Sequence, residues 1–206
     1  MKKTYLLATA ALVAFGMTSC GGSTEEAAEN TPVTYTLDAS ATTLEWKGDY
    51  ADDSHSHNGT VEISEGTVVY TGDEFTSGTF TVDMATIKDK DLPSPDSDTL
   101  NSHLAGPYFF QTANYPATKV TIKEVSDKEV KAVINVMGKD IETSIPVKLK
   151  KTDKKVTAKG KFAIDFSALD MNGTKAMDPK FPTQYVKPVI NFDLKLVMKA
   201  EEVPAK

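Results

Sequence analysis

The chain has 206 residues, of which 40% are hydrophobic and 25% are charged, and its formal net charge is −6 at pH 7. This balance is ordinary for a globular protein and suits one domain with a substantial core. All 23 basic residues are lysines. An acidic chain without arginine argues against nucleic-acid binding, where basic patches neutralise phosphates.

The N-terminus has the pattern of a bacterial secretion signal. Lys2 and Lys3 precede an apolar run at 5–15 that is too short to span a membrane. The tetrapeptide MTSC at 17–20 then resembles a lipobox, and Cys20 is the only cysteine in the chain. We therefore predict that Cys20 is acylated, the alternative being a plain signal peptide with an incidental cysteine.

Composition divides the chain into four parts. The stretch GGSTEEAAENTP is small, polar and acidic, as expected of a flexible tether. We predict a lipoprotein signal peptide at 1–19, a tether with lipidated Cys20 at 20–32, a folded domain at 33–200 and a tail at 201–206. These features predict a protein anchored by lipid in the bacterial cell envelope, at the periplasmic face or the outer membrane.

Most of the domain alternates apolar and polar residues with a period of two, which is typical of strands with one dry face. Short connections indicate antiparallel neighbours, with turns expected at Glu65–Gly66, Gly72–Asp73 and Gly138–Lys139. About eight such strands in one domain require a closed barrel or a sandwich, because open edges are a liability. A barrel of that size either fills with side chains or holds one slender ligand, and periodicity does not distinguish the two.

The segment 99–120 interrupts the strand pattern. Asp98 is a good N-cap for a short helix in which Leu100, His103 and Leu104 share one face. A Gly-Pro pair ends that helix, and three consecutive aromatic residues follow. The pattern predicts a helical plug over one end of the barrel or sandwich, or a helix that only packs on the core.

Signatures of catalysis and metal binding are weak. His55 and His57 could face the same side of a strand and share a metal, but a third ligand such as His103 lies far away in sequence. The acidic loop at 89–98 lacks the EF-hand frame, and the domain has no G-x-S-x-G motif and no cysteine nucleophile. We therefore predict neither a metal site nor an enzyme.

Several motifs occur in an order that is typical of one protein family. They are YTLD at 35–38, LEW at 44–46, GTFTVDM at 78–84, the stretch from His103–Leu104 to Tyr115–Pro116, INVMGK at 134–139 and FAID at 162–165. Together they resemble the YceI-like family of polyisoprenoid-binding bacterial proteins. Phe166 departs from the pattern, because members often carry arginine there.

The resemblance implies an all-β fold, namely an antiparallel lipocalin-like barrel of about eight strands with a short helical plug inserted mid-chain. Family members hold long isoprenoid chains, such as the tail of a quinone or a polyprenyl phosphate, in an apolar channel. They are secreted or periplasmic and often dimeric. The implied partners are thus an isoprenoid or other long-chain lipid, the membrane through acylated Cys20, and a second copy of the chain. No cofactor besides the lipid is expected.

We predict that inward-facing apolar side chains bind this ligand, that Phe109 and Phe110 close one end, and that His103 or Tyr108 contacts the head group. The inward-facing residues are Trp46, Phe80, Val82, Met84, Ile122, Ile134, Ile145, Phe162, Ile164, Phe192 and Leu194. The protein would carry, store or sense the lipid. Two alternatives stay open: an interaction or structural module with a side-chain-filled barrel, and a metal-dependent envelope enzyme that uses the histidines.

Overall fold

The computed structural model describes residues 31–176, 179–180 and 182–201. The predicted signal peptide, the predicted acylation site at Cys20 and nearly all of the predicted tail lie outside these residues. Within them, the structure contains no helix with the length and apolar character needed to cross a membrane.

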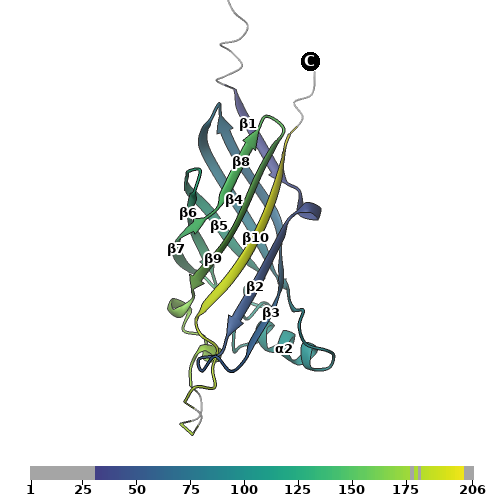
Figure 1. The fold of residues 1–206 in the computed structure, drawn as a ribbon, viewed down its shortest axis with the longest axis vertical. Coiled ribbons are helices and arrows are strands. Elements are labelled where there is room, and N and C mark those ends of the chain that lie inside the picture. Colours follow the sequence, from purple (N-terminus) through teal and green to yellow (C-terminus); the bar gives the residue numbers. More distant parts are fainter. Residues whose placement is uncertain (1–30, 177–178, 181, 202–206) are drawn as a thin grey trace, which may run out of the picture.

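The described chain folds into one antiparallel sheet of ten strands that closes into an elongated barrel (Figure 1). The strands are β1 (Pro32–Leu37), β2 (Thr43–Asp49), β3 (Ser56–Thr71), β4 (Glu74–Asp89), β5 (Ala117–Val125), β6 (Glu129–Val136), β7 (Lys139–Pro146), β8 (Lys148–Thr152), β9 (Lys155–Asp165) and β10 (Val189–Ala200). The helical elements are η1 (Ala39–Ala41), α2 (Asp96–Ala105), η2 (Ser167–Leu169) and η3 (Asn172–Thr174).

The ten strands fill eight positions around the barrel, because two positions are each shared by two consecutive strands. β1 and β2 lie end to end between β3 and β10, and each pairs with one half of β3. β7 pairs with β6, whereas β8 pairs with β9 after a break at Pro146–Val147. Proline has no N–H to donate to the ladder, which favours the exchange of partners there. This exchange closes the sheet and confirms the predicted antiparallel barrel.

The barrel has two different ends (Figure 1). One, which we call the hairpin end, carries the turns Gly72–Asp73 and Asp153–Lys154 and both ends of the described chain. The other, which we call the helix end, carries α2 and the connection 166–188 between β9 and β10. The hairpin end is built from continuous strand pairing, whereas the helix end is built from irregular segments.

The turn predicted at Glu65–Gly66 is wrong, because β3 runs through these residues without interruption. A β-bulge before Glu65 shifts the register between β3 and β4. The buried positions consequently change from odd numbers, as at Val61, to even numbers, as at Val68. Gly66 serves close packing there instead of a turn, since a Cβ at this position would overlap the ring of Phe80.

Two other local predictions are shifted along the chain. α2 begins at Asp96 with Pro95 in the cap position, so Asp98 lies in the first turn and is not the N-cap. Proline is tolerated there, because the first N–H groups of a helix have no partner inside it. The turn between β6 and β7 is formed by Met137 and Gly138, whose φ values of 50° and 76° suit a tight hairpin.

Candidate functional site

The barrel encloses an elongated cavity of about 230 Å³. It extends from Tyr70 and Met198 near the hairpin end to Tyr50 and His57 at the helix end. A single buried water needs only about 10–15 Å³, so this space is many times larger than a packing defect. Its wall is formed almost entirely by apolar side chains from the inner faces of the strands. The arrangement suits a thin apolar molecule.

The structure places every strand residue that we predicted to face inward on the wall of this cavity. These residues are Trp46, Phe80, Val82, Met84, Ile122, Ile134, Ile145, Phe162, Ile164, Phe192 and Leu194. They reach the wall because the strand period of two points alternate side chains to the same face. Phe109 and Phe110 also line the cavity, from the segment after α2. That these residues bind a ligand stays a prediction.

The two residues predicted to contact a head group lie elsewhere. His103 and Tyr108 are exposed, and neither lines the cavity. Their rings are neighbours on the surface, with centroids 6.1 Å apart and an angle of 59° between the ring planes. The helical spacing predicts one shared face for Leu100, His103 and Leu104, yet only the two leucines line the cavity. The predicted contact of His103 or Tyr108 with a head group stays a prediction, and their position outside the cavity does not favour it.

Our prediction left out other parts of the wall, both on regular strands, as at Val61, Val120 and Leu196, and where the chain is irregular. A bulge in β4 places three additional residues between Asp83 and Lys88 relative to the partner strand β3, so Ile87 faces inward at an odd position. Tyr50 and Val186 come from loops and meet in an isolated β-bridge. For these residues the sequence carries no periodic signal.

The helix end is covered by aromatic side chains from separate parts of the chain. The ring of Phe110 meets that of Phe166 at 6.2 Å, and Phe166 meets Phe192 at 6.3 Å. Phe192 stacks on Phe162 at 5.5 Å. Such edge-to-face and stacked pairs are favourable arrangements of rings. The cover therefore depends on aromatic packing between distant segments, together with the β-bridge between Tyr50 and Val186.

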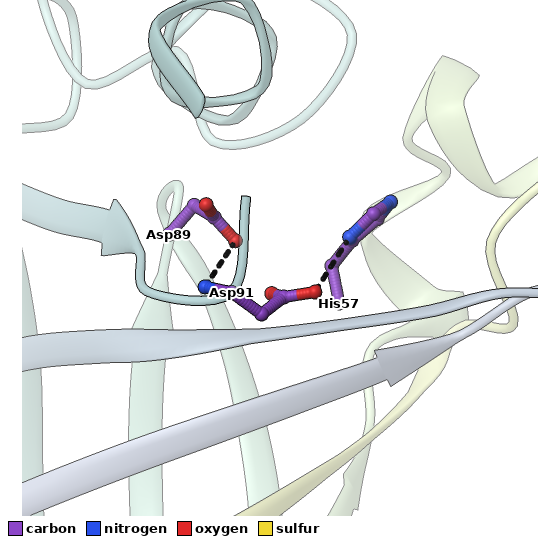
Figure 2. Close-up of side chains that lie close together, drawn as sticks. All are labelled: His57, Asp89 and Asp91. Carbon is purple, nitrogen blue, oxygen red and sulfur yellow. Dashed lines mark hydrogen bonds and ion pairs between the residues drawn. The ribbon is translucent and has the colours of Figure 1, made fainter. Parts of the chain in front are cut away.

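A polar cluster borders the cavity at the helix end, and His57 is its innermost member (Figure 2). His57 shares the inward face of β3 with Val61, a period-two signal that was available in the sequence. Its Nδ1 lies 3.2 Å from Asp91 Oδ2. Because an ionised carboxylate only accepts, Nδ1 donates this hydrogen bond. Asp91 Oδ1 in turn accepts from the backbone N–H of Asn58 at 2.8 Å.

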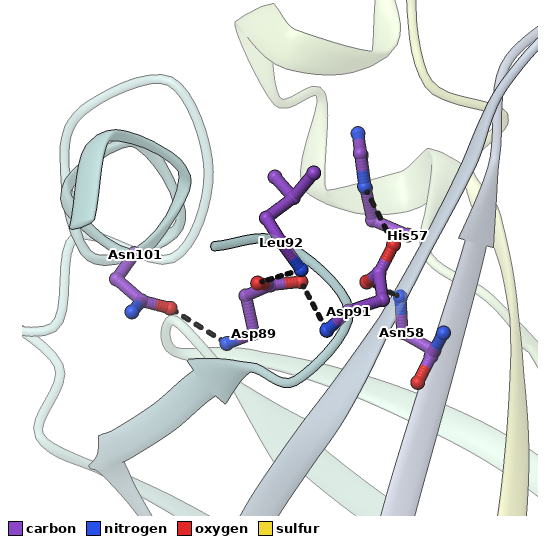
Figure 3. A network of polar contacts seen from close by, with 6 residues as sticks. All are labelled: His57, Asn58, Asp89, Asp91, Leu92 and Asn101. Carbon is purple, nitrogen blue, oxygen red and sulfur yellow. Dashed lines mark hydrogen bonds and ion pairs between the residues drawn. The ribbon is translucent and has the colours of Figure 1, made fainter. Parts of the chain in front are cut away.

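Asp89 links this cluster to α2 (Figure 3). Its carboxylate accepts from the backbone N–H of Leu92 at 2.9 Å, and its own N–H donates to Asn101 Oδ1 at 2.6 Å. Burial acts to raise the pKa of the Asp89 carboxyl, but the backbone N–H groups of Leu92 and Asp91 donate to the carboxylate and lower the pKa. The pKa consequently lies below its usual range, so Asp89 holds a buried negative charge beside His57.

One group among the described residues has the geometry to hold a cation. The ligand atoms of His57, Asp89 and Asp91 lie within 4.8 Å of one another (Figure 2). His55 and His103 are not part of this group, so the structure does not bring the three histidines together in one metal site. Nitrogen and carboxylate ligands suit a divalent ion such as Zn²⁺ or Mn²⁺. Both carboxylates, however, already accept hydrogen bonds that hold the loop after β4.

A closed antiparallel barrel around an elongated apolar cavity defines the class of lipocalin-like binding barrels. The model of the YceI-like domain matches residues 35–198. The chain therefore belongs to the YceI-like family. At the level of the family, YceI-like proteins are lipid-binding barrels rather than enzymes.

Several solved structures share the fold of this chain. BcnA of Burkholderia cenocepacia is 17% identical with a TM-score of 0.59, and the match covers 78% of this chain and 98% of that one. The YceI protein of Campylobacter jejuni is 16% identical with a TM-score of 0.50, covering 69% and 85%. A variant of it crystallised with a monobromobimane guest has a TM-score of 0.52 at 16% identity, covering 69% and 85%. No curated protein matches the chain.

Proposed function

We propose that this protein is a lipid-anchored protein of the bacterial cell envelope that holds a long-chain isoprenoid in its barrel, for carriage, storage or sensing. The observation that carries the proposal is the elongated apolar cavity. Binding would be driven by burial of the tail, at about 25 cal/mol per Å² of apolar surface, less the cost of ordering the chain. Membership of a lipid-binding family supports the same conclusion.

The cavity favours this function over an interaction module with a filled barrel. In a filled barrel, inward side chains would pack at the density of other protein interiors and leave few voids larger than a water molecule. Family membership also favours binding over catalysis. Formation of a homodimer stays a prediction, to be tested by measuring the mass of the protein in solution.

The anchor is supported by the lipobox and by Cys20. The substitution Cys20→Ser should remove the acyl chains. Each methylene group of such a chain that is buried in the membrane contributes about 0.8 kcal/mol to binding. In detergent phase separation, the wild type is expected in the detergent phase and the variant in the aqueous phase. Partition of both proteins into the aqueous phase would contradict the lipoprotein assignment.

The ligand is tested by extracting the purified protein with organic solvent and analysing the extract by mass spectrometry. An isoprenoid is expected from the wild type. Val82→Phe and Ile164→Phe add bulk to the cavity wall and should reduce the recovered isoprenoid severalfold. Val133→Phe makes the same change to a β6 residue that does not line the cavity, and its recovery should match the wild type.

Unfolding by denaturant completes this test. Overpacking a filled core typically costs about 1–3 kcal/mol, whereas a ring that enters open space should cost less than about 1 kcal/mol. We therefore expect near-normal stability with loss of ligand. Marked destabilisation, together with no isoprenoid from the wild type, would favour the filled-barrel alternative.

A further inference from the structure

The helix end of the cavity carries several carboxylates, two of them beside His57. Asp49 ends β2, Asp52 and Asp53 follow in the next loop, and Asp89 and Asp91 border the loop before α2. Lysines are also present, but Lys47 is paired with Asp49 at 2.8 Å and Lys187 is paired with Asp53. Lys90, between Asp89 and Asp91 in the sequence, is paired with Glu45 at 3.8 Å. A ligand that reaches His57 therefore meets the carboxylates of Asp89 and Asp91, whereas these three lysines are each paired with another carboxylate.

His57 is the polar group best placed to meet such a ligand. It lines the cavity, and about a quarter (26%) of its side chain is exposed. Asp91 holds the ring through Nδ1, and Figure 2 shows the second ring nitrogen pointing away from both aspartates. In the described part of the chain, no hydrogen bond to this Nε2 is found. It thus remains available to a bound molecule.

We propose that His57 receives the polar end of the ligand, and that this end is an uncharged hydroxyl or carbonyl group and not a phosphate. The inference rests on the proposed function, since it assumes a tail in the cavity. Nε2 accepts from a hydroxyl when the ring is neutral and donates to a carbonyl when it is protonated. A phosphate would bring negative charge beside Asp89 and Asp91, where like charges repel and no arginine is present to compensate.

The test compares two lipids with the same tail and different head groups. Full-length protein freed of lipid is titrated with geranylgeraniol and with geranylgeranyl phosphate, in EDTA so that no divalent cation bridges the phosphate to the aspartates. Trp46, the only tryptophan, lines the cavity, and its fluorescence reports binding. The alcohol should bind at least about tenfold more tightly than the phosphate, the effect of a modest electrostatic penalty.

Variants assign the preference to the helix end. Asp91→Asn removes one charge beside His57 and should bring the two affinities closer together, and His57→Phe should weaken binding of the alcohol severalfold. Asp73→Asn makes the same charge change at the hairpin end, where Asp73 pairs with Lys151 at 2.8 Å, and should leave the ratio unchanged.

The outcomes separate this inference from the function on which it rests. Equal or tighter binding of the phosphate, or an Asp91→Asn variant with an unchanged ratio, would overturn the head-group assignment while leaving the tail-binding function intact. Failure of both lipids to bind would overturn the proposed function and this inference with it. A preference for the alcohol that shrinks in Asp91→Asn and persists in Asp73→Asn supports the inference.

Discussion

The two ends of the barrel are closed by different means. At the hairpin end, Tyr35 and Met198 are almost fully buried, with 1% and 0% of their surface exposed. The Tyr35 hydroxyl donates to the Thr152 carbonyl oxygen at 2.9 Å, and its ring meets the edge of Tyr70 at 6.1 Å. Burial raises the pKa of both tyrosine hydroxyls above the usual value. This end is a conventional protein core.

At the helix end, the interior instead meets a charged cluster under a cover of loops. Asp89 is buried and ionised, and His57 lies between the cavity and solvent. Buried charge is costly unless hydrogen-bonded, and here backbone N–H groups supply the bonds. The contrast suggests that the hairpin end stabilises the barrel while the helix end is suited to recognition. Substitutions at the two ends should therefore separate stability from binding.

The largest effect is expected from Tyr35→Ala at the hairpin end. Removing a fully buried ring should cost about 3–5 kcal/mol of the free energy of unfolding, because the cavity left behind does not refill. Tyr35→Phe removes only the hydroxyl and should cost about 1 kcal/mol. Both are measured by unfolding in urea, with the exposed Tyr108→Ala as the control. A Tyr35→Ala cost as small as that of the control would contradict the assignment of a packed core to this end.

An intermediate effect is expected from Gly59→Ala near the helix end. A Cβ at Gly59 would overlap the Lys88 carbonyl oxygen and lie 2.5 Å from the Trp46 ring, so backbone must move. Such overpacking costs about 1–3 kcal/mol. Gly48→Ala is the matched control, since its Cβ would meet nothing closer than 3.5 Å. Equal urea midpoints for the two variants would show that the contacts of β3 with β2 and β4 are looser than the structure indicates.

The smallest effect, about 1 kcal/mol at neutral pH, is expected from Asp89→Asn. The folded-state pKa of Asp89 lies below that of the unfolded chain, so its ionised form stabilises the fold above about pH 4. That contribution is lost as the pH falls through the folded-state pKa. The stability difference between wild type and variant should therefore shrink between pH 7 and pH 3.

Urea unfolding at both pH values measures this difference. Asp127→Asn, at an exposed position in the β5–β6 turn, serves as the control for the loss of one carboxylate. A difference for Asp89→Asn that stays constant with pH would mean that its carboxylate does not hold the loop before α2.

Much of the site was predictable where the strands are regular. Phe80, Val82 and Met84 alternate with polar residues, so a period of two identified them as inward-facing. His57 follows the same rule on β3, but its polar neighbours in the sequence suggested a strand start and concealed its position on the wall. Ile87 could not be found in this way, because the bulge in β4 changes which positions face inward.

Local alternation in the sequence predicts most of the strands, their antiparallel pairing, the helical interruption and part of the apolar wall, because these depend on spacing between near neighbours. The resemblance to the YceI-like family favoured the barrel over a sandwich. The three-dimensional structure establishes where the barrel closes, through the exchange of partners at Pro146–Val147. It also decided that the cavity ends at a polar cluster. His57 and Asp91 are 34 residues apart, and their contact arises from the pairing of β3 with β4. Local patterns specify which face of a strand is dry, whereas contacts between distant residues depend on register, bulges and closure.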